Sequence, residues 1–501
     1  MRNRLLLLGA ALAAFGASLF SGFHFDDYAI FSDPVLTAPS AWMGIWSLRR
    51  TQPLTNLTFW LNYLVGGRDP FTYHLIALAL HLAAVLLAYA CLRRLLPDRA
   101  ALAAAAVFAI HPIQAEAVNY LWARADLLGT VFCLAALLSW LNRRRWTAVP
   151  LFAAALLANE RAAALPLVLL LLSPGKVGQA LPPATPDPEP LPHSDPQSLT
   201  EPRPSGSDFF HRLLPLLATF LLSLAAMTRL IYAQRQSHAV LAPWKYLLAQ
   251  APSIWRYLRL FTFPYGFTVD PDVRVPATWL GALAWLAILA AALCAWRWRS
   301  RAWTLWLLAG LLLFLPNLFP QADLYADRRM YLPMLAFAAA AGLLLTRVKT
   351  PALAAGVVVV LTLLSAVRTT VWLNDRSLWQ EAVRRAPHKV RPKIQLSRDL
   401  PAAQALELLQ RAQVEAPHDP TVPAEMGKVL LQERQVDPAL IEFGEALALD
   451  PNNAEYYTDR GVALYMSGLT ERARADFERA LEIDPNFTEA TENLRKLPQA
   501  Q

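Results

Sequence analysis

Residues 72–96 read TYHLIALALHLAAVLLAYACLRRLL, an apolar run that ends in two arginines and two leucines. About 20 apolar residues of helix are enough to cross the hydrocarbon core of a bilayer. Arginines at the end of such a run are typical of its cytoplasmic end. The stretch therefore predicts a transmembrane helix and indicates which side of the membrane it ends on.

Ten further apolar runs share this character, so we expect an integral, multi-pass membrane protein. The chain is 55% hydrophobic and only 17% charged, whereas soluble domains are about a quarter charged. The eleven expected spans are 5–22, 72–96, 99–117, 125–141, 146–158, 162–174, 212–231, 277–296, 302–320, 330–347 and 350–372.

The basic residues cluster in the short segments between these runs, for example Arg143 to Arg145. With a cytoplasmic N-terminus and eleven spans, every cluster lies inside and the C-terminal region lies outside, as the positive-inside bias requires. The formal net charge of +8 is explained in this way, so we expect no nucleic-acid partner.

Two stretches do not read as spans. Residues 174–208 are rich in proline and poor in core-forming residues, which predicts a disordered cytoplasmic loop. Residues 242–272 mix aromatic, basic and apolar residues and predict an amphipathic helix in the outer interface, with a helix pair dipping into the membrane as the alternative.

Beyond residue 373 the chain becomes charged and alanine-rich, and it repeats with a period of 34 residues. Gly427 matches Gly461, Ala446 matches Ala480, and the Asp-Pro pair at 450 recurs at 484. This period is the signature of tetratricopeptide helix pairs. We expect a linker helix at 373–386 and repeats at 387–500, with a degenerate first unit and a concave face suited to a protein partner.

The first outer loop, 23–71, begins with the acidic sequence FDDYAIFSDP. Carboxylates beside a membrane are costly unless they are solvated or paired. Asp26 or Asp27 is therefore a candidate general base, although the same residues fit ordinary surface charge or a ligand for a divalent cation. The metal and cofactor requirements stay open at this stage, as does the choice between the two aspartates, with Asp27 slightly favoured.

Three more clusters of charged residues lie between the expected spans on the same outer side. Arginines in an outer loop run against the positive-inside bias, so they are expected to have an anionic partner. The candidates for a donor phosphate are Arg124, His111, Arg328 and Arg329, and the candidates for support are Glu116, Asp126, Glu160 and Asp327. This combination fits sugar transfer from a polyprenyl phosphate to a hydroxyl group.

The motifs FDDYAIFSDP, QPLTNLTFWLNY, FAIHPIQAEAVNYLWARADLL and LPNLFPQADLYADRRMYLP, followed by the repeats, resemble the TMTC family of transmembrane and tetratricopeptide-containing O-mannosyltransferases. That family belongs to the GT-C glycosyltransferase superfamily. The resemblance implies a polyprenyl-phosphate mannose donor, a protein serine or threonine acceptor, and Asp26 or Asp27 as the catalytic base. It also implies phosphate-binding or architectural roles for Arg124, Asp126 and Arg328.

The expected fold is all-α: a polytopic membrane helical bundle of GT-C type over 1–372, followed by a tetratricopeptide α-solenoid. The expected function is that of a membrane glycosyltransferase. A non-catalytic, membrane-anchored scaffold for envelope assembly remains an alternative, and so does a polymerase or ligase of lipid-linked glycans. The donor sugar, the acceptor and the oligomeric state are left open.

Overall fold

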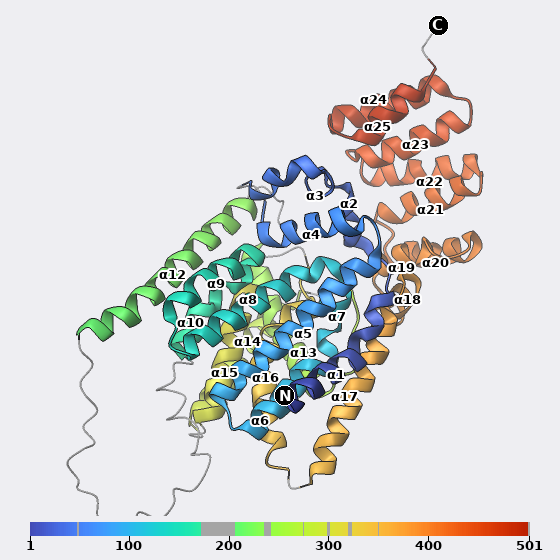
Figure 1. The fold of residues 1–501 in the computed structure, drawn as a ribbon. Coiled ribbons are helices and arrows are strands. Elements are labelled where there is room, and N and C mark those ends of the chain that lie inside the picture. Colours follow the sequence, from blue (N-terminus) through green and yellow to red (C-terminus); the bar gives the residue numbers. More distant parts are fainter. Residues whose placement is uncertain are drawn as a thin grey trace, which may run out of the picture. The chain divides into compact units, whose positions relative to one another are not determined.

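The computed structural model describes residues 1–47, 50–171, 206–234, 242–273, 275–297, 301–318, 323–348 and 350–498. Within these ranges the regular secondary structure is helical and contains no strand, which confirms the all-α prediction (Figure 1). The chain divides into two compact units. Residues 1–269 and 273–374 form the membrane unit, and residues 375–501 with 270–272 form the repeat unit.

Four stretches of the membrane unit are long and apolar enough to cross a membrane. They are Arg2–Phe20 (α1, Arg2–Phe15, with the 3-10 turn η1, Gly16–Phe20), α5 (Pro70–Leu95), Leu121–Leu141 (η5, Leu121–Ala123, with α8, Arg124–Leu141) and most of α17 (Pro351–Val371). A fifth is broken, because α6 (Asp98–Ile110) bends by 46° into Pro112–Asn119 (η4, Pro112–Gln114, and α7, Ala115–Asn119).

Helices with shorter apolar stretches account for the other expected spans. They are α9 (Arg145–Ala158), α10 (Leu165–Leu171), α12 (Gly206–Gln234), α14 (Thr278–Arg297), α15 (Arg301–Phe314) and α16 (Met334–Leu345). The membrane helical bundle is thus confirmed, whereas the count of eleven spans is not. The predicted disordered loop at 174–208 lies outside the described residues, apart from 206–208, which belong to α12.

The stretch from residue 242 forms one continuous helix, α13 (Pro243–Thr262). Tyr246, Ser253 and Tyr257 are buried on one face, while Trp244 and Trp255 are exposed. Buried positions three or four residues apart are the pattern of an amphipathic helix. The predicted amphipathic helix is therefore present.

Small residues allow the helices of the membrane unit to approach closely. A Cβ atom at Gly342 of α16 would lie 2.4 Å from the backbone oxygen of Ala100 in α6. A Cβ at Gly129 of α8 would lie 2.8 Å from the Cβ of Asn159. Small residues at such crossings are typical of membrane helix packing. The second contact brings the turn η6 (Glu160–Ala164) against α8, where two of the polar clusters meet.

The first loop folds into short helices: η2 (Phe25–Tyr28), α2 (Ala29–Ser32), α3 (Pro34–Thr37), η3 (Pro39–Trp46) and α4 (Pro53–Gly66). Asp33 begins α3 by accepting the Val35 N–H at 2.9 Å, and it also binds both terminal nitrogens of Arg50. The start of the loop is tied to the end of α17, because the His24 Nε2 lies 2.6 Å from the Trp372 carbonyl oxygen. The loop is therefore an ordered layer at one end of the bundle.

The repeat unit consists of a linker helix followed by helix pairs. Its elements are α18 (Asp375–Arg385), α19 (Val390–Ser397), α20 (Ala402–Glu415), α21 (Thr421–Gln432), α22 (Val436–Leu449), α23 (Ala454–Met466), α24 (Thr470–Ile483) and α25 (Thr488–Lys496). Both matching glycines lie under a phenylalanine of the second helix, since a Cβ at Gly427 would lie 2.7 Å from Phe443 and one at Gly461 2.6 Å from Phe477.

The degenerate first repeat replaces this glycine by Lys393, 34 residues before Gly427. Lys393 is 4% exposed, and its ammonium forms an ion pair with Glu415. The residue that corresponds to Phe443 is Leu409, which is also buried. The first repeat accepts a lysine where the other repeats need a glycine for two reasons. Leu409 is smaller than phenylalanine, and Glu415 pairs with the lysine charge.

Candidate functional site

The two adjacent aspartates of the first loop lie in very different environments. Asp27 is fully buried, and both of its carboxylate oxygens accept backbone N–H groups: that of His24 at 3.0 Å and that of Trp122 at 2.8 Å. Burial raises the pKa of Asp27 to about 7, against the lowering effect of His24 and these hydrogen bonds. Asp27 thus fastens η2 to η5.

Asp26 is exposed, and the Tyr120 hydroxyl donates a hydrogen bond of 2.7 Å to its Oδ2. Within the described residues its other carboxylate oxygen has no hydrogen-bond partner. The Tyr120 ring is itself held in place, because it stacks on Phe25 with a centroid distance of 4.6 Å. Asp26 therefore presents a positioned and accessible carboxylate, which a general base requires.

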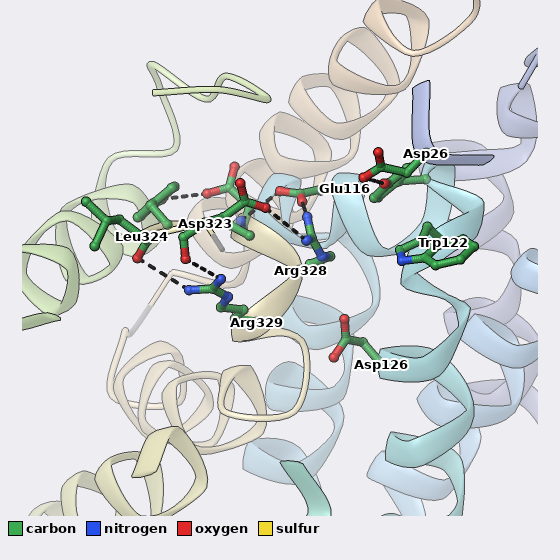
Figure 2. A network of polar contacts seen from close by, with 12 residues as sticks. Asp26, Glu116, Trp122, Asp126, Asp323, Leu324, Arg328 and Arg329 are labelled. Atoms are coloured by element: carbon green, nitrogen blue, oxygen red, sulfur yellow. Dashed lines mark hydrogen bonds and ion pairs between the residues drawn. The ribbon is translucent and has the colours of Figure 1, made fainter. Parts of the chain in front are cut away.

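Glu116 and Arg328 form an ion pair (Figure 2). The Arg328 Nη1 lies 2.5 Å from the Glu116 Oε1, and the Asp327 N–H donates to the Glu116 Oε2 at 2.7 Å. The Arg328 guanidinium also lies over the Tyr120 ring, 5.4 Å from its centroid. Tyr120 thus contacts both the acidic pair and the arginine cluster.

Asp327 and Arg329 flank Arg328 in the turn η8 (Asp327–Met330). The Tyr325 hydroxyl donates to the Asp327 Oδ1 at 2.5 Å, and burial together with the nearby Glu116 raises the pKa of Asp327 to about 7. Arg329 donates to the Asp323 backbone oxygen at 2.6 Å, while its Nε is buried without a hydrogen-bond partner in the described structure. Burial lowers the pKa of Arg329.

A polar cavity opens beside these arginines, between α8, η6, η7 (Leu315–Leu318) and η8. We call it the arginine cavity. Its polar lining consists of Asp126, Thr130, Asn159, Arg161, Asn317, Arg328 and Arg329. Three guanidinium groups face one carboxylate, so the lining carries a net positive charge. The buried amide oxygen of Asn317 has no hydrogen-bond partner among the described residues. The guanidinium groups and the unpartnered Arg329 Nε favour an anionic ligand, whereas the Asn317 oxygen accepts hydrogen bonds and fits a donor such as a sugar hydroxyl.

Asp126 contributes the negative charge of this cavity. Its Oδ1 accepts hydrogen bonds from the Asn159 amide at 2.8 Å and from the Arg161 Nη1 at 2.7 Å. Glu160 points elsewhere and accepts the Gln52 N–H at 3.1 Å, which ties η6 to the first loop. Asp126 therefore orients Arg161 at the rim, and Glu160 has a supporting role.

Arg124 and His111 do not line the arginine cavity. Arg124 is fully buried, donates to the Asn62 side chain at 2.9 Å and lies 4.2 Å from the centroid of the Phe59 ring. Both ring nitrogens of His111 are engaged, since the Nδ1 accepts the Ile113 N–H and the Nε2 lies 3.1 Å from the Phe261 carbonyl oxygen. Their predicted phosphate-binding roles stay untested, and their contacts are those of residues that stabilise the fold.

The structure also brings in residues to which the sequence analysis assigned no role, although Arg161 was noticed there with Asn159 and Glu160 as an interruption of an apolar run. Arg161 and Asn317 line the arginine cavity, and Tyr120 holds Asp26. A charged residue after Asn159 and Glu160 in an apolar run was a usable signal for Arg161. Tyr120 and Asn317 carried no such signal, because neither residue type is unusual at the end of a span.

A divalent cation was left open by the sequence. Within the described residues, no three His, Cys, Asp or Glu side chains come together as a possible set of metal ligands. Asp26 and Asp27 do not converge, because both oxygens of Asp27 are bound to backbone N–H groups. The acidic pair therefore does not fit a metal site, and no step below is assigned to a cation.

Comparison with known proteins confirms the two resemblances seen in the sequence. Residues 454–487 match the family model described as tetratricopeptide repeat. The chain is 37% identical over 149 residues to the mouse protein O-mannosyl-transferase TMTC3, a stretch covering 27% of this chain and 16% of that protein. It is 44% identical over 119 residues to the Drosophila melanogaster protein O-mannosyl-transferase Tmtc1, covering 22% of this chain and 14% of that protein.

Among solved structures, the chain aligns with an Archaeoglobus fulgidus oligosaccharyltransferase. The sequence identity is 13%, the alignment covers 81% of this chain and 58% of that one, and the TM-score is 0.36. The similarity to mannosyltransferases therefore rests on the sequence matches, which span about a sixth of those proteins' length.

Proposed function

We propose that this chain is a membrane glycosyltransferase that moves a sugar, mannose by its resemblance, from a polyprenyl phosphate to a hydroxyl group on a protein. The observation that carries the proposal is the position of Asp26. This exposed carboxylate is held by Tyr120, whose ring in turn lies against Arg328 of the arginine cavity. The proposed base for the acceptor and the proposed site for the leaving phosphate thus both contact one tyrosine.

In the proposed reaction the acceptor oxygen attacks the anomeric carbon of the donor sugar. The Asp26 carboxylate takes the hydroxyl proton as the new glycosidic bond forms. The bond from the anomeric carbon to the phosphate oxygen breaks, and the lipid phosphate leaves with the electron pair. Arg328, Arg329 and Arg161 stabilise the negative charge that grows on the phosphate, since guanidinium groups in a cavity of low dielectric act strongly on such charge.

The surroundings of the arginine cavity support a lipid-linked donor. A second, apolar cavity shares Cys133, Leu313 and Leu332 with it. The rest of the apolar lining comes from α8, α10, α15 and α16, namely Leu134, Leu137, Leu165, Val168, Trp306, Ala309, Leu335 and Ala336. A polar cavity that adjoins an apolar one suits an amphiphile with an anionic head, whereas a nucleotide sugar offers nothing for the apolar part.

The repeat unit supports a protein acceptor or partner. Its helices α19, α21 and α23 line a pocket of mixed charge that includes Arg398, Glu425, Lys428 and Glu455. Tetratricopeptide repeats commonly bind peptides on this face. We place the repeat unit and the first loop on the extracytoplasmic side, following the distribution of basic residues.

The test is sugar transfer by the purified full-length chain in proteoliposomes. Radiolabelled polyprenyl-phosphate mannose and a serine- and threonine-rich peptide are supplied together, and GDP-mannose replaces the lipid donor in a parallel reaction. We expect label in the peptide with the lipid donor and none with the nucleotide donor. Absence of transfer from either donor would favour the scaffold, and glycan elongation without peptide labelling would favour the polymerase or ligase.

A further inference from the structure

We infer that the Trp122 indole is the platform on which the transferred sugar ring rests. This inference rests on the proposed function and adds a residue that the sequence did not single out. From Val107 to Thr130 every side chain is buried except that of Trp122, which is 41% exposed. Exposed tryptophans are typical of membrane interfaces, so what distinguishes Trp122 is its place beside the acidic turn.

The backbone at Trp122 is fixed by the acidic turn. Its N–H donates to the Asp27 Oδ1 at 2.8 Å, and the neighbouring Tyr120 donates to Asp26. The indole lies near-parallel to the Phe59 ring, with a centroid distance of 6.4 Å and an angle of 20°. Arg124 lies over the same Phe59 ring at 4.2 Å. The backbone of Trp122 is thus anchored, and its indole lies beside Phe59 with part of its surface uncovered.

Trp122 lies between the two chemical parts of the candidate site. It is four residues before Asp126, which lines the arginine cavity, and the 3-10 turn η5 that carries it leads directly into α8. On its other side it adjoins the turn that carries Asp26 (Figure 2). A sugar whose phosphate occupies the arginine cavity and whose anomeric carbon lies near Asp26 therefore meets this indole.

The chemistry of an indole suits a pyranose ring. The apolar C–H face of a hexose packs on a flat aromatic surface, and the indole N–H donates to a hydroxyl group. The backbone N–H of Trp122 donates to Asp27, but in the described part of the chain no protein group accepts the N–H of its indole ring. Trp122 is thus assigned as a positioning residue that contacts the sugar, distinct from the arginines that contact the phosphate.

The test measures binding of two lipids to the full-length chain in nanodiscs: polyprenyl-phosphate mannose and the same polyprenyl phosphate without sugar. We expect Trp122→Ala and Trp122→Leu to weaken binding of the mannose lipid about tenfold, which is the upper range of an aromatic contact. Binding of the sugar-free lipid should not change. Trp122→Phe keeps a flat aromatic face and should retain most of the affinity for the mannose lipid. Trp46 is an exposed tryptophan of the first loop, so the control variant Trp46→Ala should bind both lipids like the wild type.

The backbone N–H that holds Asp27 survives all three substitutions of Trp122, so the fold is expected to persist. If the substitutions weaken binding of both lipids equally, or change the binding of neither lipid, the assignment is overturned and Trp122 is an interfacial anchor. Failure of the wild-type chain to bind either lipid would instead contradict the proposed function itself.

Discussion

The Tyr120 hydroxyl donates a hydrogen bond of 2.7 Å to the Asp26 carboxylate and so connects the first loop to the start of the apolar stretch Leu121–Leu141. Removing this hydroxyl leaves the carboxylate without its anchor. We expect Tyr120→Phe to slow sugar transfer about tenfold, since a hydrogen bond to a charged group contributes about 1.5 kcal/mol or more. The measurement is kcat in proteoliposomes, with Tyr465→Phe on the repeat unit as the control. Wild-type kcat in Tyr120→Phe would show that Asp26 needs no such anchor.

The buried ion pair between Glu116 and Arg328 predicts a stability effect. Glu116→Gln leaves the Arg328 charge in a desolvated place without its carboxylate, which we expect to cost about 3 kcal/mol. The exposed pair of Arg93 and Asp98 provides the control, because Asp98→Asn should cost less than about 1 kcal/mol. Thermal unfolding in detergent measures both. Equal midpoints for the two variants would mean that the Glu116 pair is solvated.

The acidic turn predicts how stability depends on pH. The pKa of Asp27 is raised from 3.8 to about 7 by burial, so the folded state keeps a proton that the unfolded chain releases near pH 4. The folded state therefore binds more protons in this window, and stability falls as the pH rises from about 4 to 7. Asp27→Asn should flatten the fall in unfolding temperature between pH 5 and pH 8. An unchanged slope in this variant would assign the effect to other groups, such as Asp327.

The repeat unit offers a matched pair of glycines. At Gly461 a Cβ would meet the Phe477 ring at 2.6 Å, whereas at Gly444, in helix α22, nothing lies within 4 Å. We expect Gly461→Ala to destabilise the repeats by about 1–3 kcal/mol through overpacking and Gly444→Ala to stabilise them by about 0.5–1 kcal/mol. Hydrogen exchange of peptides from α23 and α24 in the full-length chain reports both changes. Equal protection in the two variants would contradict this packing.

The arrangement of basic residues predicts the topology. A reporter fused after residue 373 should be extracytoplasmic, and one inserted within 174–205 should be cytoplasmic. Alkaline phosphatase activity and fluorescence of a green fluorescent protein fusion distinguish the two sides. Both reporters on one side would mean that the span count between them is wrong by an odd number.

Much of the fold was predictable, because it depends on local patterns. The 34-residue period revealed the helix pairs, since in the two well-formed repeats the phenylalanine ring of one helix needs a glycine in the other. The apolar runs revealed the membrane helices, but several runs are broken by 3-10 turns at Pro112, Glu160 and Leu315. Such breaks depend on tertiary contacts, which is why the number of full-length spans was not predictable.

For the candidate site, the sequence predicted which loops take part but not which of their side chains are exposed or line the cavity. Asp26 and Asp27 are neighbours in the sequence, yet one is exposed and the other fully buried, because side chains one residue apart in a 3-10 turn point in different directions. The sequence slightly favoured Asp27, while the geometry favours Asp26 as the base. Likewise Arg124 looked like a phosphate ligand beside Asp126, but Arg161, from a separate turn, lines the cavity instead.

Transfer of mannose from polyprenyl-phosphate mannose by three purified variants tests the central claim most directly. We expect Asp26→Asn to lower kcat by a factor of about 100 or more, as loss of a general base does. Asp69→Asn should transfer at the wild-type rate, because this exposed aspartate caps α5 and asparagine caps equally well. Asp27→Asn should lower thermal stability at pH 5 but retain transfer in the fraction that folds. Wild-type kcat in Asp26→Asn, with transfer abolished in well-folded Asp27→Asn, would contradict the assignment of the base.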